Sequence, residues 1–244
     1  MEFYLTENII LKDNKTYFKK DSNIKEINNN NWHHYLGEFG WSKMPLPWIK
    51  QLNKISDKYH KNSPFGIFDC ISDGDCFFHC ISNALNDYNR LNNDYEIMNS
   101  SSIRSIIADS ITDDNFKEMI GFYKIMKDCD DFDEEWDPYE IKDLYSFRDI
   151  IRQSGHNYWC DYILLNQITK ILKLNIFILN SNEEYKNYSI YNTLIEYNPE
   201  YDTIFLLYED ECHFKLMGFF DGENMISYFT ENIPTEFLKL FKLR

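Results

Sequence analysis

The pattern of hydrophobic and polar residues changes abruptly at Cys76. The four residues before it, Ser72 to Asp75, are typical of a loop, and Gly74 accepts backbone angles that other residues resist. Asp75 occupies the position of a helix N-cap. After Cys76, apolar residues recur at helical spacing, as Phe77, Cys80, Ile81, Ala84 and Leu85. The pattern therefore predicts a tight loop followed by a buried helix that carries Cys76 in its first turn.

Further along the chain, helical periodicity alternates with short apolar runs that predict strands. The expected helices cover residues 48–55, 103–111, 116–126, 141–153, 160–172 and 234–244, and the expected strands cover residues 65–71, 174–179, 185–195, 203–208 and 213–219. The last two strands are expected to form a hairpin across an acidic turn. Residues 1–30 mix short apolar pieces with polar runs, and no helix or strand is predicted there.

The composition is that of a folded globular protein, with 43% hydrophobic and 17% aromatic residues. A chain of 244 residues can form one large domain, or one domain with an extension. The net charge of −15 argues against a nucleic-acid binder, which normally presents a basic field. An acidic protein instead suits a basic protein partner, and the acidic segment 128–137 is expected to be a solvated loop that can face one.

The six cysteines contain no CxxC pair and predict reduced thiols in a reducing compartment. The first residues lack a signal-peptide pattern, and no apolar run approaches the ~18 residues of a membrane span. We therefore expect a cytoplasmic protein without a transmembrane segment. The heavy use of Asn, Ile, Lys and Tyr indicates an AT-rich genome, such as that of a large DNA virus or an intracellular bacterium. With such a source, the protein is expected in the host cytoplasm.

Cys76 is the leading candidate for a reactive side chain. Unpaired N–H groups and the dipole at a helix N-terminus favour a thiolate, so the Cys76 pKa is expected to be lowered. A tight loop with a glycine also aims N–H groups at a substrate, as in an oxyanion hole. The first alternative is a buried structural cysteine, which is the commoner role. The second is a zinc site formed with Cys80, Cys212 and His213, although the usual paired ligand spacing is missing. No metal or organic cofactor is expected.

A cysteine nucleophile needs a histidine base that is close in space but not in sequence. Of the six histidines, His213 is the best placed, because it begins the second strand of the predicted hairpin and a strand holds its side chains rigidly. A purely structural histidine is the alternative. The others are His79 on the Cys76 helix and, in irregular or polar segments, His33, His34, His60 and His156.

Three motifs, in the same order, resemble those of the ovarian tumour (OTU) cysteine proteases, most of which are deubiquitinases. The segment from Asp73 to Phe78 is similar to the family's nucleophile motif. Trp159-Cys160-Asp161, followed by a predicted helix and strand, is similar to the second motif, and His213-Phe214 is similar to the third. The resemblance covers about residues 64–220.

The resemblance implies an α+β fold, in which a small mixed β-sheet is flanked by helices. It places an OTU-like catalytic domain at residues 61–220. Residues 1–60 are then an N-terminal helical extension and a candidate accessory substrate-binding region. Residues 221–244 form a C-terminal tail that is expected to be helical.

The resemblance also implies hydrolysis after the C-terminal glycine of ubiquitin or a ubiquitin-like protein, through a thioester on Cys76 with His213 as general base and acid. Backbone N–H groups at residues 73–76 would hold the oxyanion, so Gly74 and Asp75 are expected to contact the substrate. Trp159 would line the channel for the Gly-Gly tail. The expected partners are ubiquitin or polyubiquitin chains, or another ubiquitin-like modifier, and the enzyme is expected to be a monomer.

Lys215 departs from the family pattern, which usually has Asp or Asn two residues after the histidine to orient its ring. Lysine has no acceptor for the imidazole N–H. Some members take this acid from a segment before the cysteine, so Asp69 and Asp73 are candidates, and Asp73 also suits a role in the oxyanion loop. The departure keeps two alternatives open: an inactive OTU-like module that binds ubiquitin, and a cysteine protease of another polypeptide.

Overall fold

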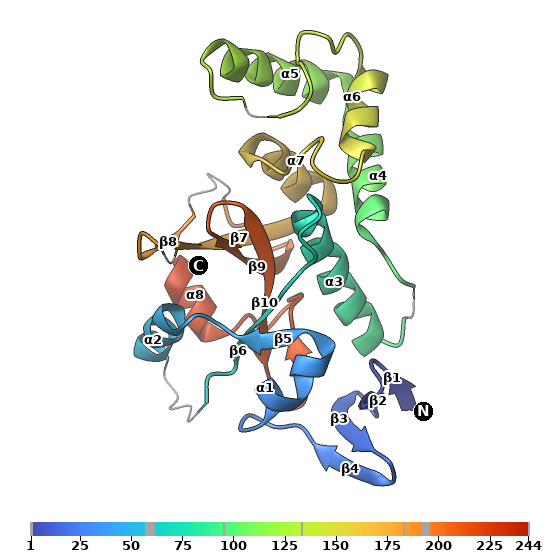
Figure 1. Cartoon of the computed structure of the whole chain (residues 1–244), viewed down its shortest axis with the longest axis vertical. Coiled ribbons are helices and arrows are strands. Elements are labelled where there is room, and N and C mark those ends of the chain that lie inside the picture. Colours follow the sequence, from blue (N-terminus) through green and yellow to red (C-terminus); the bar gives the residue numbers. More distant parts are fainter. Residues whose placement is uncertain are drawn as a thin grey trace.

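The computed structural model describes residues 2–56, 62–94, 96–132, 134–182, 184–191 and 196–243. In these ranges a mixed β-sheet forms the centre of the molecule (Figure 1). Its strands lie in the order β5 (Trp41–Lys43), β6 (Phe65–Phe68), β10 (His213–Phe220), β9 (Asp202–Glu209), β7 (Leu174–Asn182) and β8 (Asn187–Ile190), and β11 (Met225–Ile226) pairs with β10. The pair β7 and β9 is parallel and the others are antiparallel.

The predicted strands are confirmed, including the hairpin of β9 and β10. The strand expected over 185–195 corresponds to β8, while residues 192–195 lie outside the described ranges. The central strands are hydrophobic on both faces because both faces are covered. In β7, Ile176 and Ile178 face one core cluster, and Phe177 and Leu179 face the other.

The first face of the sheet is covered by α3 (Cys76–Leu91), which packs against β10. The chain then continues through α4 (Ser100–Ser110), α5 (Asp113–Asp128), α6 (Leu144–Arg152) and α7 (Tyr162–Leu172). Figure 1 shows α5 and α6 beyond one end of the sheet, with α7 between them and β7. The five helices confirm the α part of the predicted α+β fold, and α3 begins at Cys76 as expected.

The second face is covered by α2 (Leu46–Ile55) and α8 (Thr235–Phe241), which pack against each other. Phe237 of α8 is fully buried in the core cluster of this face. The C-terminal helix was expected, but the tail from 221 is not helical throughout, since β11 precedes α8. Within the described ranges, no helix combines the length and the apolar character that crossing a bilayer requires.

The start of the chain corrects a prediction, because the extension is not purely helical. An antiparallel sheet comes first, formed by β1 (Glu2–Tyr4), β2 (Ile9–Lys12), β3 (Lys15–Lys20) and β4 (Asn23–Glu26). These strands are short: β1 and β4 are largely exposed, and the buried residues of β2 are one run, Ile9 to Leu11, so none shows the clear alternation that predicts strands. A signal does exist at Asp13-Asn14, whose φ values of 50° and 60° form the two-residue turn of a hairpin.

The rest of the predicted extension joins the main sheet. After α1 (Trp32–Tyr35) and the 3-10 helix η1 (Leu36–Phe39), β5 pairs with β6. The buried Trp32 donates its Nε1–H to the Ser63 carbonyl over 3.0 Å and stacks on Phe220. The predicted boundary at residue 60 thus falls between two strands that pair with each other.

Candidate active site

The loop before α3 is fixed by a buried ion pair, which corrects the expected role of Asp75. Asp75 is the N-cap residue, but its side chain does not cap the helix. Its Oδ1 instead accepts hydrogen bonds from Arg104 of α4, at 2.9 Å from Nε and 2.5 Å from Nη2. The buried cation attracts the carboxylate more strongly than a neutral N–H of the first helical turn would.

Arg104 ties three segments together. Its side chain is fully buried, and its Cζ lies 3.9 Å from the centre of the Phe78 ring. Besides Asp75, it donates to the carbonyl oxygens of Ile151 (2.9 Å) and Tyr158 (3.0 Å). The start of α3, the end of α6 and the loop before α7 are therefore held in one arrangement.

Gly74 lets the nucleophile loop approach the loop before α7 at backbone contact. Its φ is +89°, and a Cβ at this position would lie 2.4 Å from the Gly155 carbonyl carbon. The Gly155 N–H donates to Asp75 Oδ1 over 3.0 Å. Both the backbone angle and the lack of space require glycine here. The structure thus explains Gly74 as a residue that shapes the loop.

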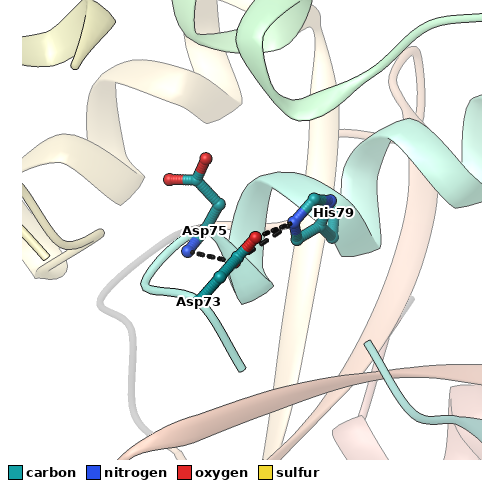
Figure 2. Close-up of side chains that lie close together, drawn as sticks. All are labelled: Asp73, Asp75 and His79. Atoms are coloured by element: carbon teal, nitrogen blue, oxygen red, sulfur yellow. Dashed lines mark hydrogen bonds and ion pairs between the residues drawn. The ribbon is translucent and has the colours of Figure 1, made fainter. Parts of the chain in front are cut away.

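Asp73 links the same loop to α3 through contacts with Asp75 and His79 (Figure 2). Its Oδ1 accepts the Asp75 backbone N–H over 3.0 Å, and its Oδ2 lies 3.0 Å from His79 Nε2. Figure 2 shows the Asp75 carboxylate pointing away from this pair. Asp73, Asp75 and His79 have ligand atoms close enough for a shared metal ion, but the Asp75 carboxylate is already paired with Arg104. We therefore attribute the cluster to loop structure.

The β9–β10 hairpin brings His213 and Phe214 to the start of α3. The Phe214 backbone N–H points at Cys76 Sγ over 3.5 Å. The Phe214 ring packs edge-on against Phe77 of α3 and stacks on Tyr208 of β9, with ring centres 5.3 and 4.5 Å apart. Residues 138 positions apart in the sequence thus meet at the thiol.

His213 contacts the segment between β6 and α3 through both ring nitrogens. Nε2 lies 3.0 Å from Asp69 Oδ1, and Nδ1 lies 3.3 Å from Ser72 Oγ. A carboxylate only accepts hydrogen bonds, so a neutral imidazole carries its proton on Nε2 and accepts at Nδ1. Of the two candidate acids, Asp69 contacts the His213 ring, whereas Asp73 contacts His79.

Burial dominates the acidity of the Cys76 thiol, which differs from the expectation. Cys76 is 8% exposed, and this burial raises the pKa of its thiol above the ordinary value. The N–H groups of Phe214 and Phe77 lower it by less. At this thiol, burial thus outweighs the effect of the helix N-terminus on the pKa.

Trp159 lines two cavities, and Phe77 and Phe214, the residues on either side of the thiol, line one of them. Trp159 is 38% exposed, and its backbone N–H points at the Glu134 carboxylate over 3.3 Å. The first cavity, of about 220 Å³, is mainly aromatic and lined by Phe77, Trp159, Tyr162, Tyr191, Tyr208 and Phe214, among others. The second, of about 340 Å³, is lined by Met126, Asp131, Phe132, Glu134, His156, Trp159 and Asp161. The first cavity is therefore mainly aromatic, and the second carries the carboxylates of Asp131, Glu134 and Asp161.

Asp161 is a half-buried acid that lines both cavities, and its ionisation is predicted to cost stability. Burial raises the pKa of Asp161 to about 6, against an unfolded value of about 3.9. Because the folded protein favours the protonated acid, the contribution of Asp161 to the free energy of unfolding is fully present below pH ~3.9. It is lost as pH rises through about 6. Asp161→Asn keeps an acceptor for the Leu164 N–H, now 2.8 Å away. We expect Asp161→Asn to melt like the wild type at pH 4 and about 4 °C higher at pH 7.5.

The matched control is Asp143→Asn, at the N-cap of α6. Hydrogen bonds from Ser146 lower the pKa of Asp143, which is the opposite direction. This variant should gain nothing at pH 7.5. Thermal unfolding followed by circular dichroism measures both variants. An Asp161→Asn melting temperature that differs equally from the wild type at both pH values would contradict the assignment.

The cysteines do not form the alternative zinc site in the described ranges, where the one group of three or more potential ligands is Asp73, Asp75 and His79. Cys70 and Cys80 are a buried pair of free thiols with sulfur atoms 3.5 Å apart. Cys212 is exposed at the tip of the hairpin.

Three residues of the site were missed from the sequence: Ser72, His79 and Arg104. Arg104 had a usable signal, because it shares a helix face with Ile107, Ala108 and Ile111, and a cation on a buried face needs a partner. Ser72 and His79 had none beyond their closeness to Cys76.

Comparison with known proteins gives a family match over the segment that carries this site. The family model described as OTU-like cysteine protease matches residues 71–214. No match to a curated protein sequence was found.

Solved structures with weak similarity include an OTU domain in complex with ubiquitin, with 13% identity, a TM-score of 0.41, and coverage of 72% of this chain and 81% of that one. An OTU deubiquitinase from Wolbachia pipientis wMel bound to ubiquitin has 10% identity, a TM-score of 0.41, and coverage of 66% and 99%. The viral OTU domain protease from Qalyub virus has 15% identity, a TM-score of 0.38, and coverage of 63% and 83%.

Proposed function

Because the chain belongs to the OTU-like cysteine protease family, we propose that it is a deubiquitinase. The reaction is hydrolysis of isopeptide or peptide bonds after the C-terminal glycine of ubiquitin or a ubiquitin-like protein. The observation that carries the proposal is the meeting of Cys76, at the start of α3, with the His213-Phe214 end of the hairpin, where the Phe214 N–H lies 3.5 Å from the thiol. The substrate class follows from the family resemblance, since most OTU proteases are deubiquitinases.

The reaction begins when His213 takes the proton from Cys76 and the thiolate attacks the carbonyl carbon of the terminal glycine. For this step the Nδ1 of His213 must exchange its contact with Ser72 for one with the thiol. We assign the oxyanion to the N–H groups of Gly74 and Cys76, because the Asp75 N–H already donates to Asp73. A ring held by Asp69 at Nε2 keeps its lone pair on Nδ1, where a base needs it.

The tetrahedral intermediate collapses when His213 protonates the leaving lysine amine and the C–N bond breaks. A thioester between Cys76 and the glycine remains. Water then gives its proton to His213 and attacks the thioester, and the thiolate leaves with ubiquitin released as a carboxylate. We assign Trp159 and the aromatic cavity beside Phe214 to the channel for the Gly-Gly tail.

The experiment is cleavage of a ubiquitin C-terminal fluorogenic amide, compared with a titration of ubiquitin binding. Cleavage by the wild type and none by Cys76→Ala is the expected result. Binding without cleavage would favour an inactive ubiquitin-binding module. Neither binding nor cleavage by the folded protein would refute the proposal and leave a protease of another polypeptide as the next hypothesis.

Asp69 is predicted to be the acid that orients His213. Asp69→Ala should lower kcat by about 10- to 100-fold, which is less than the loss of the base itself. Asp69→Asn keeps an acceptor oxygen and should lose less. Asp73→Ala tests the other candidate acid. It removes the contact with His79 and should leave unchanged the pH at which kcat/KM rises. A larger shift of that pH in Asp73→Ala than in Asp69→Ala would contradict the assignment.

A further inference from the structure

Lys215 lies two residues after His213 on β10, on the same face of the strand. Its side chain is 14% exposed, so it is fixed among neighbours. Nζ lies 2.5 Å from Glu209 Oε2 and 3.7 Å from Asp69 Oδ1. Despite burial, which lowers it, the pKa of Lys215 is raised overall by these two carboxylates, and the ammonium is charged.

Asp69 has little to hold it in place without this cation. Its side chain is 64% exposed and belongs to the segment between β6 and α3. The oxygen that Lys215 approaches, Oδ1, is the same oxygen that contacts His213 Nε2. A single exposed pair gains little, since ordering both side chains costs entropy and water screens the attraction. A second partner on a rigid strand reduces both costs.

We propose that Lys215 is a positioning residue, which holds Asp69 against His213 while Glu209 holds Lys215. The proposal rests on the deubiquitinase function given above. Two carboxylates and one ammonium leave a net negative charge beside the ring, so the cluster still favours the imidazolium that forms when Cys76 is deprotonated. An acid at position 215 would orient the His213 ring directly. Lys215 orients it indirectly, by holding Asp69 in place.

A purely structural role for Lys215 makes a different prediction. Glu209 and Lys215 lie on the two paired strands of the hairpin, and their ion pair alone would stabilise it. Removing Lys215 would then lower the free energy of unfolding, by the same amount whether or not Asp69 is present. A double-mutant cycle separates the two roles, because only residues that act through each other show coupling.

The kinetic test uses Lys215→Met and Lys215→Arg, each alone and with Asp69→Ala, on the fluorogenic ubiquitin amide. Lys215→Met should lower kcat by roughly 10-fold, because the base is misoriented, and change KM by less than about 2-fold. Lys215→Arg keeps the cation and should rescue most of kcat. In the Asp69→Ala background, Lys215→Met should cost nothing further. An equal loss in both backgrounds, or a loss confined to KM, would overturn the proposal.

A second readout needs no substrate and separates this proposal from the proposed function. Nitrogen NMR of the imidazole, assigned with His213→Ala, reports which ring nitrogen carries the proton. The wild type and Lys215→Arg should show the proton on Nε2, and Lys215→Met should show a mixture of both tautomers. If the wild type cleaves no ubiquitin but the tautomer responds in this way, the function fails and the positioning role stands. If the wild type cleaves ubiquitin and Lys215→Met changes neither kcat nor tautomer, the positioning role alone fails.

Discussion

Replacing Arg104 by methionine is expected to destabilise the protein by about 3–5 kcal/mol, which is the usual cost of removing one partner of a buried ion pair. The Asp75 carboxylate, with 3% of its side chain exposed, would lose the cation that compensates its charge. The carbonyl groups of Ile151 and Tyr158 would also lose a donor. Urea unfolding followed by circular dichroism measures the change.

The matched control is Arg152→Met, which removes surface ion pairs to Asp109 and Asp149, whose side chains are 64% and 73% exposed. Each such pair is worth about 0–1 kcal/mol. Where Arg104→Met is still folded, its activity should fall by about 100-fold, because the loop before Cys76 loses the contact that sets its position. Equal stabilities of the two variants would contradict the account of this ion pair.

His213→Ala is expected to lower kcat for ubiquitin cleavage by about 10²- to 10⁴-fold. The same residue deprotonates Cys76 and protonates the leaving amine, so both steps suffer. Because burial raises the pKa of Cys76, the thiol cannot compensate by ionising on its own near neutral pH. The rate of the variant should rise steadily with pH through the range in which the free thiol titrates.

The control for this prediction is His34→Ala, which changes an exposed histidine of α1. Its kcat should equal that of the wild type. Stopped or continuous assays at several pH values with the fluorogenic ubiquitin amide give both results. A His213→Ala variant with wild-type kcat and pH dependence would remove His213 from the mechanism.

The local sequence is sufficient to predict the parts of the site that lie within one segment. The change from loop residues to helical spacing at Cys76 predicts α3, and the two apolar runs around the acidic turn predict the hairpin that carries His213. The continuous apolar runs of β7 and β9 predict these strands, because both faces of the sheet are buried there. In each case neighbouring residues carry the signal, so a single chain contains it.

For contacts between distant segments, the sequence reduces the number of candidate residues but does not identify the pair that forms. Both Asp69 and Asp73 precede Cys76 closely, and only the path of the loop decides that Asp69 reaches a histidine 144 residues away. From the sequence, Asp75 is interpreted only as a helix cap. The sequence does not show that α4 places the buried Arg104 next to it. The N-terminal sheet was missed because its strands are short and none alternates regularly between apolar and polar residues: β1 and β4 are largely exposed, and β2 is one short buried run.

The most direct test of the central claim is covalent labelling with ubiquitin that ends in a C-terminal propargylamide, which traps a thiolate placed at the glycine carbonyl. The wild type should form one adduct, and peptide mass spectrometry should locate it on Cys76. Cys76→Ala should form none, and His213→Ala should react much more slowly. A folded wild-type protein that forms no adduct, or an adduct that persists in Cys76→Ala, would contradict the claim that this chain is a ubiquitin-directed cysteine protease acting through Cys76.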